Sequence, residues 1–236
     1  MDDDRLRDGK ASRMSGTLAE SRPGLAVAPG ELTPGDLAAA AAVLARAYRD
    51  TPLSIAVYGR DALRRQHKGE RLFSARLAAM TPLPHIAHRD GSIVGVCAMT
   101  PPTMVDIPDI VLLKHVYPLI GSRAASRVVR MVSVWRSREP KERHWHLGPV
   151  GVEPGRQGMG IGSLMIKCFC DRMDAESEMA WLETDTAENV RLYEKFGFCV
   201  VDQADVLGVP NWFMRREPGN SAPRKAGSPR WSQGGT

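Results

Sequence analysis

A turn with three alternating glycines constrains the fold of this chain more than any other feature. Residues 150–163 read Val-Gly-Val-Glu-Pro-Gly-Arg-Gln-Gly-Met-Gly-Ile-Gly-Ser, an apolar strand followed by glycines at 158, 160 and 162 and then by a helical pattern. A plain strand-to-helix turn needs only one glycine, whereas three allow several backbone N–H groups to converge. Because the positive end of a helix dipole follows directly, the turn predicts a phosphate or pyrophosphate site.

Two familiar phosphate-binding motifs fit this turn less well. A P-loop needs Lys followed by Ser or Thr after its last glycine, but Ser163 and Leu164 follow Gly162. A Rossmann fingerprint nearly fits, because Glu183 lies about 20 residues downstream, as a ribose ligand would. Its third glycine is replaced by Ser163, however, and too little chain remains for a complete doubly wound half. An NAD-binding oxidoreductase is therefore a distant alternative.

The hydrophobic pattern of the rest of the chain predicts strands and helices in mixed order. Strands are expected at residues 25–28, 84–89, 92–100, 144–152, 179–184, 198–202 and 211–215. Helices are expected at residues 34–49, 61–80, 108–120, 122–138, 160–175 and 187–196. Thr33-Pro34 is a helix start signal, and Asp90-Gly91 between two apolar runs is a hairpin signal. This mixture predicts an α/β or α+β fold, a sheet with helices packed on its faces.

Length and charge indicate one domain with two tails. A chain of 236 residues fits one well-filled domain, which we expect at residues 24–217. Residues 1–23 and 218–236 are polar and lack the apolar content that offsets ordering entropy, so both are expected to be disordered. Most of the net charge of +5 comes from residues 215–236. The nearly neutral body has no basic face for a phosphate backbone, so no nucleic-acid partner is expected.

The spacing of the cysteines and the residues at the N-terminus indicate the cellular compartment of the protein. Cys97, Cys168, Cys170 and Cys199 show neither a disulfide framework nor zinc-finger spacing, and are interpreted as small buried residues in a reducing compartment. Three aspartates open the chain where a secretory signal would carry positive charge. The apolar stretch 110–120 is too short to span a bilayer. We expect a cytoplasmic protein, monomeric or homodimeric, with no membrane partner and no metal.

Two motifs on consecutive predicted helices carry a family resemblance. Gln157-Gly-Met-Gly160-Ile-Gly162 resembles the Q/R-x-x-G-x-G/A motif of the Gcn5-related N-acetyltransferase (GNAT) superfamily, whose loop binds the pyrophosphate of acetyl-coenzyme A. Residues 189–198, which read Asn-Val-Arg-Leu-Tyr-Glu-Lys-Phe-Gly-Phe, are similar to a second signature of that superfamily. The two occur in the expected order, and the resemblance covers residues 25–217.

The resemblance implies both a fold and an activity. The fold would be a single GNAT-like domain, with a mixed, mostly antiparallel central sheet flanked by helices and two parallel strands that splay apart at the cofactor site. The activity would be transfer of an acetyl group from acetyl-coenzyme A to the primary amine of a small molecule, by direct attack in a ternary complex. Residues 144–152, 182–184 and 212–215 and the helical pair within 104–139 look closest to the puromycin N-acetyltransferase-like branch.

The resemblance also implies which residues would bind the cofactor. The pyrophosphate would lie on a loop formed by Gln157, Gly158, Met159, Gly160, Ile161, Gly162 and Ser163. The pantetheine arm would pair with the main chain of Val150, Gly151 and Val152. Gly148, Pro149 and Gly151 interrupt this strand, which suits a bulge or bend, and a bulge there could aim an N–H at the thioester oxygen. Asn189 would hydrogen-bond the arm, or would instead cap its own helix.

Three residues are candidates for proton transfer. Tyr193 falls where the superfamily often places the acid that protonates the departing thiolate, and an ordinary phenol pKa of ~10 suits that step. Alternatively, Tyr193 is an ordinary aromatic residue packed in the core. His146 and Glu183 compete as the base that deprotonates the amine, and their alternatives are a structural histidine and a surface carboxylate. A catalytically idle coenzyme A-binding or regulatory module is the alternative of a different class, and Tyr193 together with a base favours an enzyme.

Overall fold

The computed structural model describes residues 25–29, 34–80, 84–102 and 108–219. Its strands are β1 (Leu25–Pro29), β2 (His85–Arg89), β3 (Ser92–Thr100), β4 (Trp145–Val152), β5 (Ala180–Thr184), β6 (Cys199–Val206) and β7 (Val209–Arg216). Its helices are α1 (Pro34–Tyr48), α2 (Pro52–Tyr58), α3 (Ala62–Ala78), α4 (Asp109–Ile120), α5 (Ser122–Arg136), α6 (Ile161–Glu176) and α7 (Ala187–Glu194). A short 3-10 turn, Pro154–Arg156, follows β4.

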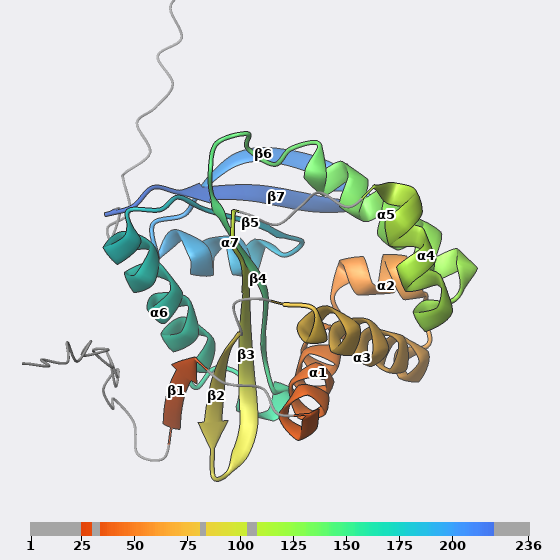
Figure 1. Ribbon diagram of the computed structural model, residues 1–236, viewed down its shortest axis with the longest axis horizontal. Coiled ribbons are helices and arrows are strands. Elements are labelled where there is room, and N and C mark those ends of the chain that lie inside the picture. Colours follow the sequence, from red (N-terminus) through yellow and green to blue (C-terminus); the bar gives the residue numbers. More distant parts are fainter. Residues whose placement is uncertain (1–24, 30–33, 81–83, 103–107, 220–236) are drawn as a thin grey trace, which may run out of the picture.

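The strands form one sheet that opens in its middle. The described part of the chain contains a seven-stranded sheet in the order β1-β2-β3-β4-β5-β7-β6. Neighbouring strands are antiparallel except β4 and β5, which are parallel. Figure 1 shows β1 to β4 aligned along one axis, in alternating directions, and β5, β7 and β6 turned across that axis. The predicted mixed, mostly antiparallel sheet with one splayed parallel pair is therefore confirmed.

Each predicted strand and helix is present, and three details differ. Helix α2 was not predicted, because seven residues are too few to show a helical period. Its start at Thr51-Pro52 carries the same signal as Thr33-Pro34, and the Thr51 side chain accepts a hydrogen bond from the backbone N–H of Ser54. Strands β6 and β7 run further than predicted and meet at Leu207-Gly208. Thr33 and most of the two predicted tails lie outside the described residues.

The hairpin between β2 and β3 is where the sequence placed it. Asp90 and Gly91 have φ angles of 52° and 74°. Both are positive, as a type I′ turn requires, and Asp-Gly is a pair that adopts this turn at low cost. Arg89 and Ser92 pair on either side of it. The register of these two strands therefore begins at a locally encoded turn.

Helices cover both faces of the central strands. Helix α1 lies on one face of β3 and β4, and α6 lies on the other (Figure 1). The side chains of Val150 and Val152 pack into the cluster on the α6 side. Gly151, between them, faces α1, where an added Cβ would lie 2.8 Å from Leu44 Cδ2 and 3.1 Å from Ala47 Cβ. The sheet and α1 can approach this closely because residue 151 has no side chain.

We expect Gly151→Val to lower the free energy of unfolding by about 1–3 kcal/mol, the usual cost of forcing extra atoms into a packed core. Leu44 is fully buried and cannot swing aside freely. Chemical denaturation of the wild-type protein and the variant measures the difference. Gly155→Val is the control, because an added Cβ at Gly155 meets nothing within 4 Å. Equal stability of the two variants would show that α1 is not held against Gly151.

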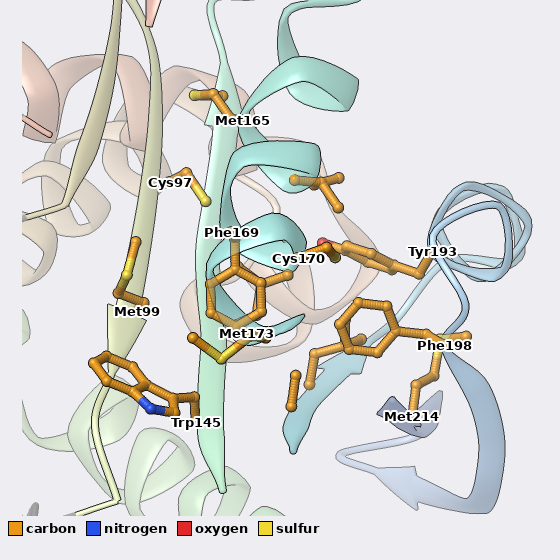
Figure 2. Packing of buried hydrophobic residues seen from close by; sticks show 14 of the residues in the cluster. Cys97, Met99, Trp145, Met165, Phe169, Cys170, Met173, Tyr193, Phe198 and Met214 are labelled. Atoms are coloured by element: carbon orange, nitrogen blue, oxygen red, sulfur yellow. The ribbon is translucent and has the colours of Figure 1, made fainter. Parts of the chain in front are cut away.

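The largest cluster of buried residues fills the space between the sheet, α6 and α7. Figure 2 shows Phe169, Cys170 and Met173 of α6 facing Met99 and Trp145 of the strands. Cys97, Cys168 and Cys170 are buried free thiols, as expected. The prediction that all four cysteines are buried is wrong for Cys199. This residue is exposed because it begins the edge strand β6.

Candidate active site

The centre of the candidate site is a gap between β4 and β5. The two strands pair only at Trp145 with Ala180 and at His146 with Trp181. Beyond these pairs β4 continues beside β3, and β5 continues beside β7. Their main-chain groups that face each other across the opening are therefore free of inter-strand hydrogen bonds.

A bulge lies on β4 at the start of this gap. Leu147 pairs with Met99, and Val150 pairs with Cys97. Gly148 and Pro149 on β4 thus oppose a single residue on β3, which is the definition of a bulge. The bulge predicted from the glycine and proline in this strand is present. It bends β4 away from β5 just beyond His146.

A cavity of about 700 Å³ occupies the gap. Almost all residues predicted from the sequence to form a site contribute to its wall, namely His146, Val150, Gly151, Val152, Gln157, Gly158, Gly160, Ile161, Gly162, Ser163, Glu183, Asn189 and Tyr193. The exception is Met159, which packs against the large core cluster and whose sulfur lies 3.8 Å from a guanidinium nitrogen of Arg89. The structure therefore brings together residues from β4, the glycine-rich loop, β5 and α7.

The glycine-rich loop ends at the N-terminus of α6, where the backbone N–H groups of Ile161, Gly162 and Ser163 have no hydrogen-bond partner among the described residues. Gly158 and Gly160 have φ angles of 75° and 81°, in the left-handed region that favours glycine. Gly160 is the N-cap of α6, and no side chain caps this end of the helix. Leu164 N–H is the first to bond within the helix, to the carbonyl of Gly160 at 3.0 Å. The preceding N–H groups and the helix dipole form a site that fits a pyrophosphate.

The two residues that compete for the role of base are hydrogen-bonded to each other. His146 Nε2 lies 2.8 Å from Glu183 Oε2. The side chain of Glu183 is 7% exposed and that of His146 is 19% exposed, so neither is a surface residue. Parallel pairing of His146 with Trp181 aligns the two strands so that these side chains meet. They form a His–Glu pair at the edge of the gap.

Tyr193 is both a packed aromatic residue and a wall of the cavity. Figure 2 shows it extending from α7 into the core cluster, where its ring meets Phe198 edge to face at 5.7 Å between ring centroids. Burial raises the pKa of Tyr193 well above 10, with smaller contributions from Tyr48, Cys97 and Glu183. The ordinary phenol pKa assumed from the sequence therefore does not hold. The phenol keeps its proton throughout the neutral range.

The amides of Gln157 and Asn189 have different surroundings. Gln157 Nε2 donates to the carbonyl of Val152 at 3.2 Å, so this side chain ties the loop back to β4. Asn189 lies in the first turn of α7 and lines the cavity. The capping alternative has no hydrogen bond to support it, because within the described residues the Asn189 side chain makes none. Its amide is available to a bound molecule.

Among the residues of the gap that the sequence did not indicate, Tyr48 makes the most direct contact with β4. Its hydroxyl accepts a hydrogen bond from Val150 N–H and donates one to the carbonyl of Val150, both at 3.1 Å. The ring packs against Phe73 with 5.5 Å between centroids, and burial raises the pKa of Tyr48. The only signal in the sequence is an aromatic residue at the end of a predicted helix. That signal does not show which strand the residue reaches.

The main chain of β4 faces the gap at alternate residues. The N–H and C=O of Val150 point into the gap, where Tyr48 binds them, so those of Val152 do as well. Gly151 turns its main chain the other way, toward its partner Val96 on β3. The hydrogen bond from Glu153 N–H to the carbonyl of Val94 follows the same alternation. This alternation favours the main chains of Val150 and Val152 as pairing groups, and pairing through Gly151 stays a prediction from the resemblance.

The other half of the cavity is mainly apolar. Its wall comes from α2, α3 and α5, through Leu53, Val57, Leu72, Phe73, Val128, Met131 and Trp135. Polar side chains also line this half, among them Ser54, Arg65, Arg76, Asp185 and Asn211. Arg76 donates from Nη2 to the carbonyl of Gly148 at 3.1 Å. Asp185 accepts from the backbone N–H of Leu53 at 2.8 Å, and burial raises the pKa of this carboxyl.

The described residues lack both a metal site and a membrane-spanning helix. They contain no group of three or more His, Cys, Asp or Glu placed to hold a metal ion. In the same part of the chain, no helix has both the length and the apolar character needed to cross a bilayer.

Comparisons with known proteins agree with this geometry. The sequence model of the acetyltransferase (GNAT) family matches residues 57–198, more than half of the chain. A structure of histone acetyltransferase HPA2 and related acetyltransferase from Corynebacterium glutamicum has a TM-score of 0.64 at 20% identity, covering 83% of this chain and 97% of that one. An agmatine N-acetyltransferase gives 0.55 at 14% identity, covering 81% and 99%. The yncA protein of Salmonella typhimurium with its cofactor acetyl-CoA gives 0.51 at 16% identity, covering 86% and 99%. At these identities the structures establish a shared fold.

Proposed function

The chain belongs to the GNAT acetyltransferase family, and from that premise we propose that it transfers an acetyl group from acetyl-coenzyme A to the primary amine of a small molecule. The observation that supports this most directly is that the free donors of the glycine-rich loop, the β4–β5 gap, the His146–Glu183 pair and Tyr193 all line one cavity. We also propose that the protein is similar to the puromycin N-acetyltransferase-like branch, that it is cytoplasmic, and that it has no nucleic-acid partner.

The loop and β4 would bind the acetyl donor. N–H groups at the start of α6, with Gly158 and Gly160 leaving room for close approach, would hold the pyrophosphate. Val150 and Val152 would pair with the pantetheine arm, and Asn189 would contact it. When bound, acetyl-coenzyme A supplies the thioester carbon that the amine attacks. An N–H of β4 near the bulge would stabilise charge that develops on the thioester oxygen.

His146 would act as the base, and Glu183 would position it. His146 is the more exposed member of the pair, so its ring would contact the amine. Glu183 would accept a hydrogen bond from Nε2 of the same ring. A carboxylate bonded to one ring nitrogen fixes the tautomer and stabilises the imidazolium that forms. His146 Nδ1 would then take the proton from the attacking amine.

Tyr193 would act as the acid. Its buried phenol keeps its proton at neutral pH and can give it to the departing thiolate. The same apolar surroundings raise the pKa of a thiol, which keeps this proton transfer feasible.

The apolar half of the cavity favours an amine carried on an apolar body. Trp135 and Met131 would pack against such a body, while the carboxylates of Glu183 and Asp185 lie where a cationic amine would arrive. A thiol-release assay with acetyl-coenzyme A and a panel of small amines, antibiotics and peptide N-termini tests the proposed function. Release with an apolar amine supports it, whereas binding of coenzyme A without release for any acceptor supports the idle module instead.

We expect Gly160→Val to weaken coenzyme A binding at least ~10-fold, about 1.4 kcal/mol. A β-branched residue is strained at a φ of 81° and would displace the N–H groups around it. Calorimetry with coenzyme A measures the change. Gly155→Val, in the 3-10 turn just before this loop and in open space, is the matched control and should bind as the wild-type protein does. An unchanged dissociation constant for a folded Gly160→Val protein would remove the pyrophosphate assignment.

A further inference from the structure

The hydroxyl of Tyr48 makes the two hydrogen bonds that a neighbouring strand would make to Val150. It accepts from the N–H and donates to the carbonyl, at 3.1 Å in each case. Strand β5 has already separated from β4 at this level, because the last parallel pair is His146 with Trp181. Tyr48 therefore substitutes for the missing strand at one position of the gap.

The position of Tyr48 is fixed by the fold. It is the last residue of α1, the helix that packs on β3 and β4 and approaches β4 closely at Gly151. The ring is held on Phe73 of α3, and the hydroxyl reaches into the cavity that also contains Tyr193. Because α1 and α3 both hold Tyr48 in place, its hydroxyl would bind the N–H and C=O of Val150 whenever no other molecule does.

We propose that Tyr48 competes with the pantetheine arm of coenzyme A for the main chain of Val150, so that the arm binds only when the hydroxyl leaves. This inference rests on the proposed function, from which it takes the path of the arm. A backbone N–H has one proton and donates well to one acceptor at a time. Pairing of Val150 with Tyr48 and pairing of Val150 with the arm therefore exclude each other.

The competition distinguishes between ligands. Each amide of the pantetheine arm carries both an N–H and a C=O, so it replaces both hydrogen bonds of Tyr48. A nucleotide that ends at the pyrophosphate has no such groups and stays on the glycine-rich loop, away from Val150. Tyr48 thus lowers the affinity for ligands that extend along β4 and leaves the affinity for the nucleotide alone unchanged.

Calorimetry on Tyr48→Phe tests this with two probes. One is coenzyme A, and the other is 3′-phosphoadenosine 5′-diphosphate, which has the nucleotide but no arm. We expect Tyr48→Phe to bind coenzyme A about 3- to 10-fold more tightly, the net strength of roughly one neutral hydrogen bond. The nucleotide should bind equally to the variant and the wild-type protein. Tyr58→Phe is the matched control, since Tyr58 also lines the cavity but makes no hydrogen bond to Val150.

Tyr48→Leu is measured beside Tyr48→Phe, because it also lacks the hydroxyl and gives a second protein if the first does not fold. Thermal melting confirms that each variant is folded. Unchanged or weaker coenzyme A binding, with normal nucleotide binding, would overturn the competition. An equal gain for both probes, or the same gain in Tyr58→Phe, would overturn it as well. Failure of the wild-type protein to bind either probe would instead refute the proposed function.

Discussion

Replacing Tyr193 with phenylalanine is expected to lower turnover about 100-fold or more, the usual size of a general-acid effect. The change removes only the hydroxyl that would protonate the thiolate. Within the described residues this hydroxyl has no hydrogen-bond partner, so its loss leaves no other group unsatisfied. The ring stays in its edge-to-face contact with Phe198, and the fold keeps its packing there.

Three measurements separate an acid from a packing residue. Turnover is measured with the best acceptor found in the thiol-release assay, coenzyme A affinity by calorimetry, and stability by thermal melting. Affinity and melting temperature should stay near the wild-type values while turnover falls. Turnover close to wild type would assign the proton to water or to another residue.

The raised pKa of Tyr193 also predicts the shape of the rate profile against pH. Because burial holds this pKa well above 10, the phenol remains protonated as the pH rises through the neutral and mildly alkaline range. Tyr193 should therefore contribute no fall in rate at mildly alkaline pH. A fall there that disappears in Tyr193→Phe would show that its phenol ionises much more readily.

Replacing His146 with glutamine is expected to lower kcat/KM for the acceptor by about 100- to 1000-fold and to abolish the acid limb of its pH profile. Glutamine can still hydrogen-bond Glu183 but cannot take up a proton. Glu183→Gln should cost less and should keep the acid limb, since His146 remains to take up the proton.

The rate of the double variant, His146→Gln with Glu183→Gln, is a second measurement on this pair. Because the two side chains are hydrogen-bonded at 2.8 Å, their effects should not add, and the double variant should be about as slow as His146→Gln alone. Coenzyme A affinity is checked in each protein. An acid limb lost in Glu183→Gln but kept in His146→Gln would make Glu183 the base. Persistence of the limb in both would leave deprotonation to solvent.

The sequence alone determined the order of the elements except α2, and the position of the glycine-rich loop. Hydrophobic period, turn pairs such as Asp90-Gly91, and the glycines at 158 and 160 act over a few neighbouring residues. A pyrophosphate site made of backbone N–H groups needs only a local strand, turn and helix. These features could therefore be predicted without knowledge of the packing, and the two family motifs indicated which chemistry surrounds them.

Only the tertiary structure decided how the side chains of the site meet. His146 and Glu183 looked like rivals because their contact spans 37 residues and depends on the register of two parallel strands. Tyr48 and Val150 are 102 residues apart, and the direction of the Val150 main chain depends on a bulge opposite β3. The need for glycine at 151 likewise arises from the packing of α1. Register, bulges and helix packing are set by the whole sheet and core, so no local pattern in the sequence encodes them.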